Sequence, residues 1–186
     1  TGVDVVEWNV DEANKRSRIG GFNKRAVFEV GDATSLGFHG ETFDVVVSQD
    51  AWCHVPDKRR VVSEAVRVAK SSGYIAFTDW VELSDMEPDY LRDVQSAVAA
   101  PNFAKPAFYE SWLLDEGCKI ISHNDISQRF VSRYNSMISK LKSIEPEIIE
   151  NYNKDIFSIV MQKNELILKA FRDGKIGGSE IIAQKG

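Results

Sequence analysis

The chain has 186 residues, 43% apolar and 27% charged, a composition typical of one globular domain with a substantial core. Its net charge of −5 disfavours nucleic-acid binding, which depends on clustered Lys and Arg. No stretch is long and apolar enough to span a bilayer, and the first residues lack a basic signal-peptide segment. We therefore expect a soluble, cytoplasmic protein with no nucleic-acid or membrane partner, and leave a homodimer open.

The two cysteines, Cys53 and Cys118, are too few for a disulfide scaffold and lack metal-ligand spacing, so no metal site is expected. The short basic run at residues 58–60 is most simply a solvated helix face.

The first eighty residues alternate strand and helix. Asp57 is expected to cap the second helix and Gly73 to follow its end. The strands are continuously apolar, which predicts a mostly parallel sheet covered on both faces, the doubly wound α/β fold. We expect strands at 1–6, 26–30, 43–48 and 74–78, and helices at 8–19 and 57–70.

The second half changes pattern. A short helix is predicted at 108–117, a strand at 118–122 and a last strand at 179–184. Between those strands, residues 130–173 carry helical apolar stripes, broken by Pro146. We therefore expect a single domain, 1–186, with an inserted helical cap at 130–173 over the crevice.

Carboxylates follow the first two strands, and ligands of open α/β sheets bind outside such strand ends. Asp4 could accept both hydroxyls of a ribose. Asp32 could accept an adenine amine while the N–H of Ala33 donates to a ring nitrogen. Either carboxylate could instead be an ordinary turn residue, and Glu7 is the alternative to Asp4 if the strand runs further.

The third strand ends in SQDAWCH. Ser48 and Gln49 would face the bound ligand there. His54 could act as a general base or orient a substrate, because imidazole titrates near neutral pH. Alternatively it is a helix-flanking residue bonded to backbone. Cys53 would be a nucleophile only with a lowered thiol pKa, and we expect a small buried hydrophobe instead.

The segments GVD, VGDA, FDVVVSQDAWCHVPDK and GYIAFTDW resemble class I S-adenosylmethionine-dependent methyltransferases. They are most similar to sarcosine/dimethylglycine and phosphoethanolamine N-methyltransferases. The resemblance implies S-adenosylmethionine as cofactor, with Asp4 at the ribose, Asp32 and Ala33 at the adenine and Gln49 at the methionine part. It also implies that His54 and Trp52 lie toward the methyl-acceptor pocket.

The sequence departs from that family in two places. The family's own first strand and the Gly-rich loop that follows it are absent from this sequence. In the family's sheet that strand is central, between the strands that correspond to residues 1–6 and 43–48. The absence of that strand should leave backbone N–H and C=O groups of the neighbouring strands without hydrogen-bond partners. Trp80 stands where the phosphobase enzymes have Tyr, and with Trp52 and Tyr109 it could form an aromatic surface for a methylated ammonium. The alternative for these three is core packing, which is our expectation for Trp112.

These observations predict methyl transfer from S-adenosylmethionine to the amine of a small molecule, of the glycine, sarcosine or dimethylglycine type, leading to betaine. The alternatives are phosphoethanolamine methylation and a non-catalytic remnant. A nicotinamide dehydrogenase explains neither SQDAWCH nor the cap.

Overall fold

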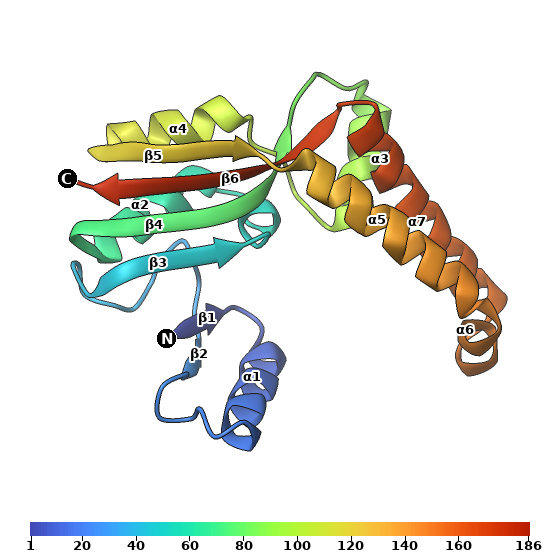
Figure 1. Ribbon diagram of the computed structural model, residues 1–186, viewed down its shortest axis with the longest axis horizontal. Coiled ribbons are helices and arrows are strands. Elements are labelled where there is room, and N and C mark those ends of the chain that lie inside the picture. The colour runs from blue at the N-terminus through green and yellow to red at the C-terminus, as the bar shows by residue number, and fades with distance from the viewer.

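The computed structural model describes residues 1–186, and it is a mixed α/β structure with two separate sheets (Figure 1). The strands are β1 (Gly2–Asp4), β2 (Phe28–Val30), β3 (Phe43–Gln49), β4 (Ala69–Glu82), β5 (Cys118–Asp125) and β6 (Ile176–Lys185). The helices are α1 (Glu7–Ile19), α2 (Lys58–Val68), α3 (Pro88–Val98), α4 (Pro106–Asp115), α5 (Ser127–Ser143), α6 (Glu145–Asn151) and α7 (Lys154–Arg172), with a 3-10 turn at Trp52–His54.

The larger sheet has the strand order β3-β4-β6-β5. β3 and β4 are parallel, and β6 runs antiparallel to both of its neighbours, so β3, β4 and β5 share one direction. β1 and β2 form a parallel two-stranded sheet of their own. No strand of the chain pairs with β1 on one side and β3 on the other, as expected from the missing central strand.

Helices cover one face of the large sheet. Alternate residues of β4, Ile75 and Phe77, are buried with α2 and α4 in one core cluster, together with Ile181 of β6. The opposite face is open: Val45 and Val47 of β3 are 50% and 71% exposed. The α/β fold class is confirmed. Cover on the second face is not seen at β3, because no helix within residues 1–186 packs over those side chains.

A second core cluster joins the cap to the rest of the chain. It contains Trp80 and residues of α3, α5 and α7, such as Val94, Phe130 and Phe171. Helices α5, α6 and α7 lie between β5 and β6 in the sequence and project beyond the sheet (Figure 1). None of the chain's helices has the length and apolar content needed to cross a membrane.

Local differences from the sequence expectations have physical reasons. Asp57 caps α2, its side chain accepting the N–H of Arg60 at 2.9 Å. Gly73 does not end that helix, because α2 stops at Val68 and Gly73 lies within β4. There a Cβ would meet the carbonyl oxygen of Lys70 at 2.8 Å, so glycine permits a close backbone approach. Helix α3, which begins at Pro88, was missed because its apolar stripe is short.

Candidate functional site

A cavity of about 420 Å³ lies between the end of β3 and the cap helices. Three parts of the chain line it: the loop after β3, the end of β4 together with α3, and the facing sides of α5 and α7. Its lining is mainly apolar, with a few ionisable side chains, as is common for small-molecule sites. The lining residues used below are Asp50, His54, Trp80, Phe130, Arg133, Tyr134, Lys163 and Asn164.

His54 is exposed, lines this cavity and is held from one side. Its Nδ1 lies 3.1 Å from the carbonyl oxygen of Ala99, the residue that ends α3 in a left-handed conformation at φ +55°. A carbonyl oxygen can only accept, so Nδ1 carries the proton and donates. In the neutral ring Nε2 then holds the free lone pair, which is the state that a general base requires.

Asp50 is a site residue that sequence reasoning missed, although it lies inside the SQDAWCH motif. It has φ +51°, an unusual value for a non-glycine residue. Its N–H donates to the carbonyl of Thr78 at 2.8 Å, and the Thr78 hydroxyl donates to its Oδ1 at 2.7 Å. These two bonds fix the carboxylate at the cavity wall, where its other oxygen, Oδ2, lies 3.8 Å from a guanidinium nitrogen of Arg133.

An aromatic wall faces these polar groups. Trp80, at the end of β4, makes edge-on contacts with Phe130 and Tyr134 of α5, at centroid distances of 5.4 and 5.9 Å. Trp80 is 8% exposed and Phe130 5% exposed. The structure thus brings two of the residues singled out from the sequence, His54 and Trp80, to one cavity.

The other two aromatic candidates lie elsewhere. Trp52 and Tyr109 belong to the core under α2 and α4, where both contact Phe77, and neither lines the cavity. Tyr109 is fully buried, and its hydroxyl donates to Asp79. The structure therefore places them in the core packing that the sequence left as the alternative. Trp112 packs beside the same core, against Phe108 and Tyr109.

Two buried charged groups hold the loop that carries His54. Asp79 is fully buried and accepts the N–H of Cys53 at 2.8 Å, and burial raises the pKa of its carboxyl to about 6. Lys58 is 3% exposed, and its ammonium donates to the carbonyls of Cys53, Val55 and Asn102. The prediction of a solvated basic run is thus wrong for Lys58. Burial lowers its pKa, and the carbonyl bonds compensate its charge.

Cys53 lies in the same turn and is 1% exposed. Burial raises the pKa of its thiol, and the nearby Asp79 carboxylate adds to that effect. A raised pKa disfavours the thiolate, so Cys53 is a small buried side chain and not a nucleophile.

The two strand-end carboxylates lie on the small sheet and its following loop. Asp4 ends β1 and accepts the N–H of Val6 at 2.8 Å and the amide of Asn9 at 3.0 Å. Asp32 follows β2, and its Oδ1 takes both the N–H and the hydroxyl of Thr34 at 2.8 Å. These bonds lower the pKa of the Asp32 carboxyl, which stays ionised, and its Oδ2 is free to accept.

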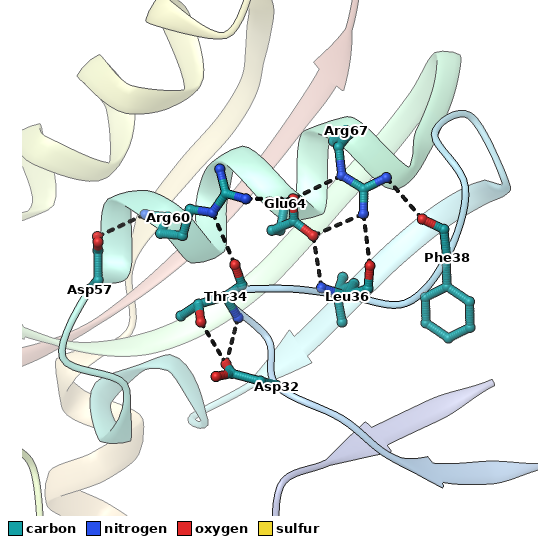
Figure 2. Close-up of polar contacts among 8 residues, drawn as sticks. All are labelled: Asp32, Thr34, Leu36, Phe38, Asp57, Arg60, Glu64 and Arg67. Atoms are coloured by element: carbon teal, nitrogen blue, oxygen red, sulfur yellow. Dashed lines mark hydrogen bonds and ion pairs between the residues drawn. The ribbon is translucent and has the colours of Figure 1, made fainter.

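Helix α2 holds the loop that follows Asp32 (Figure 2). The buried carboxylate of Glu64 accepts the N–H of Leu36 at 2.8 Å and two bonds from Arg67 at 2.8 Å. Arg67 also donates to the carbonyls of Leu36 and Phe38. Residues far apart in sequence are thereby tied together, and the position of Asp32 is set by α2 rather than by the small sheet alone.

Ser48 and Gln49 end β3 at the open edge of the large sheet, where Gln49 is exposed and Ser48 half-buried. Both β1 and β3 point toward the side on which the cap helices lie (Figure 1). The strand ends that carry Asp4, Ser48 and Gln49 therefore face the same side, with no paired strand between them.

Comparisons with known proteins find similarity to methyltransferases. A family model described as a methyltransferase domain matches residues 1–77. A 27-O-demethylrifamycin SV methyltransferase from Amycolatopsis mediterranei is 24% identical over 166 residues, 87% of this chain and 60% of that protein. A sarcosine/dimethylglycine N-methyltransferase from Halorhodospira halochloris is 30% identical over 154 residues, 79% of this chain and 54% of that protein.

The fold is also that of solved structures. One from Galdieria sulphuraria, provisionally named a sarcosine dimethylglycine methyltransferase, has a TM-score of 0.88 at 18% identity, over 99% of this chain and 68% of that one. The chain therefore shares the fold of that structure. In sequence it is similar to methyltransferases, including a sarcosine/dimethylglycine enzyme, and it spans between half and two thirds of the length of the two relatives described.

Proposed function

We propose that the protein transfers a methyl group from S-adenosylmethionine to the amine of a small molecule of the glycine, sarcosine or dimethylglycine type. The observation that carries this proposal is the cavity in which His54, Asp50 and the aromatic wall around Trp80 meet at a strand end. The similarity to the named sarcosine/dimethylglycine enzyme supports the same substrate class.

The residues present fit the nucleoside part of the cofactor. Asp32 is ionised with a free Oδ2, and Asp4 uses one bond on each oxygen, which leaves lone pairs for hydroxyl donors. Under this proposal Asp4 binds the ribose, Asp32 and Ala33 bind the adenine, and Ser48 and Gln49 lie beside the methionine part. The cofactor supplies an already activated methyl group, so the protein mainly has to position the acceptor.

The chain's own residues would handle the proton and the orientation of the acceptor. Nε2 of His54 can accept a proton from an ammonium acceptor and so produce the neutral, nucleophilic amine. Trp80, Phe130 and Tyr134 exclude water from one side and offer aromatic ring faces to the methylated nitrogen. Cation–π attraction of this kind contributes about 0.5 to 2 kcal/mol.

Two alternatives have their own support. Phosphoethanolamine methylation fits the SQDAWCH motif, although Trp80 offers no phenolic hydroxyl for a phosphate. A non-catalytic role is favoured by the open edge of β3, since Ser48 and Gln49 lie at that edge.

Calorimetric titration of S-adenosylmethionine and S-adenosylhomocysteine into the 186-residue chain tests cofactor binding. Micromolar affinity that falls at least tenfold in Asp32→Asn is expected. Product mass after incubation with glycine, sarcosine, dimethylglycine or phosphoethanolamine then identifies the acceptor. His54→Ala should abolish turnover, whereas His39→Ala, which changes an exposed histidine outside the cavity, should not. Absence of cofactor binding by the folded chain would favour the non-catalytic alternative.

A further inference from the structure

The cavity has opposite charges on its two sides. Asp50 and His54 come from the loop after β3, whereas Arg133 comes from α5 and Lys163 from α7. The two sides approach each other at Arg133, whose guanidinium nitrogen lies 3.8 Å from Oδ2 of Asp50. A ligand that occupies the cavity therefore meets a carboxylate and an imidazole on one side and two cations on the cap side.

Both cations remain available to a ligand. Lys163 makes no hydrogen bond or ion pair with any residue of the chain. The sole ionic contact of Arg133, to Asp50, spans 3.8 Å, which is beyond hydrogen-bond distance. Two other cations of the same helices are engaged, Arg129 with Glu180 and Lys142 with Glu165, whereas Lys140 is unpaired like Lys163 but lies outside the cavity.

The formal charge of the cavity indicates an anionic ligand. Two cations and the single carboxylate of Asp50 leave a net charge of +1, and His54 adds a second positive charge once it holds the proton of the acceptor amine. Such a cavity can compensate either a carboxylate or a phosphate monoester. The similarity to a sarcosine/dimethylglycine enzyme favours the carboxylate.

We propose that Arg133 and Lys163 bind the carboxylate of the methyl acceptor, so that its amine lies toward Asp50 and His54. This inference rests on the proposed function and deepens it, because it restricts the acceptor to short N-methylated amino acids. Choline-like amines that lack an anionic group would lose the contact with the cap. The cap helices would thus determine substrate specificity, while the loop after β3 supplies the base.

Binding to the full 186-residue chain tests the proposal without any need for turnover. The probes are N,N-dimethylglycine, N,N-dimethylethanolamine, which lacks the carboxylate, and phospho-N,N-dimethylethanolamine. Isothermal titration and saturation-transfer NMR would give the affinity of each. The variants are Arg133→Gln, Lys163→Gln and the double change. The matched control is Lys140→Gln, an exposed lysine of α5 that does not line the cavity.

We expect dimethylglycine to bind at least tenfold more tightly than dimethylethanolamine. Each single change should weaken dimethylglycine about tenfold, the double change should abolish its binding, and the control should stay within twofold. Binding of dimethylglycine that the double change leaves intact, equal affinity for dimethylethanolamine, or no binding of dimethylglycine would overturn the proposal. If phospho-N,N-dimethylethanolamine bound more tightly than dimethylglycine and lost its affinity in the same variants, Arg133 and Lys163 would bind a phosphate and not a carboxylate.

Titration of S-adenosylhomocysteine into the same samples separates this inference from the proposed function. If dimethylglycine binding depends on the two cations but S-adenosylhomocysteine does not bind, the carboxylate site stands and methyl transfer by this chain fails. If S-adenosylhomocysteine binds and dimethylglycine does not, the carboxylate site fails and the methyltransferase proposal remains.

Discussion

The part of the chain before Trp52 and the part from Trp52 onward differ sharply in how many residues they bury. Of the 41 buried residues only Val10 and Ser17 precede Trp52, although β1, α1, β2 and β3 all lie in that part of the chain. The region from Trp52 onward contains two core clusters of 16 and 15 residues. Secondary structure of the same regularity can therefore form with very different support from packing, and the cofactor-side residues lie on the poorly packed part.

The largest effect should come from a cavity in the well-packed region. Leu113→Ala removes a fully buried side chain of α4 and should lower the free energy of unfolding by about 3 kcal/mol. Val10→Ala in α1 should cost about 1 kcal/mol, because valine loses fewer methyl groups than leucine and Val10 belongs to neither core cluster. Urea denaturation checks both values. Equal costs would mean that the two regions are equally well packed.

The second effect concerns the pH dependence of the buried Asp79. Its pKa of about 6 lies above the unfolded value of 3.8, because burial favours the neutral acid. Between these two pH values the native state therefore binds more protons than the unfolded state. The stability that Asp79 contributes is complete below about pH 4 and is lost as the pH rises to about 6. The loss is about 3 kcal/mol, at about 1.4 kcal/mol per pKa unit.

Asp79→Asn should remove that slope. Urea midpoints of wild type and variant between pH 4 and 7 measure it, and the difference between the two curves cancels the contributions of exposed carboxylates. If the difference in urea midpoint between wild type and variant were the same from pH 4 to 7, Asp79 would have an ordinary pKa in the folded chain.

The third effect concerns the tether between the two regions. Glu64→Gln keeps the acceptor for Leu36 but removes the charge that binds Arg67, and should cost about 2 kcal/mol. Amide hydrogen exchange should also accelerate across residues 32–38. Glu12→Gln, a half-exposed carboxylate on the surface of α1, is the control and should change neither. Unchanged exchange in the Glu64 variant would mean that the small sheet holds the loop by itself.

The smallest effect on stability is expected at the open edge of β3. Val47→Lys changes a side chain that is 71% exposed, so the free energy of unfolding should move by less than about 0.5 kcal/mol. Self-association in sedimentation velocity should decrease, because a lysine discourages edge-to-edge strand pairing. Leu114→Lys, on an exposed part of α4, should leave association unchanged. An equal decrease in both variants would assign the effect to net charge.

Local patterns predicted most elements of the fold. The strands at 43–48 and 118–122 and the cap of α2 at Asp57 follow from apolar runs and capping chemistry, which act over a few residues. The open sheet face could not be predicted, since it depends on what packs against Val47 and not on Val47 itself. Gly73 was misassigned because a glycine that permits close backbone approach looks the same in sequence as one that ends a helix.

The candidate site was predictable only where a motif marked it. His54 was found because imidazole is rare and lies at a strand end, whereas its partner is a backbone carbonyl, at Ala99, which no residue type reveals. Asp50 was present in the motif but lacked a distinguishing signal, because its unusual backbone angle is visible only in the structure. Arg133 and Lys163 lie on helices whose apolar stripes gave no hint of a cavity.

Strand β4 contributes to both core clusters through alternate side chains. Asp79 and Val81 face the core under α2 and α4, while Trp80 faces the cavity and the cap. A single-residue insertion or deletion before Trp80 would therefore turn each side chain to the opposite face of the strand. The indole of Trp80 would then occupy the place of the buried Asp79, and the Asp79 carboxylate would lie against Phe130. The alternation of side chains along β4 thus serves both the core and the cavity. Insertions and deletions in that strand should be tolerated far less well than substitutions.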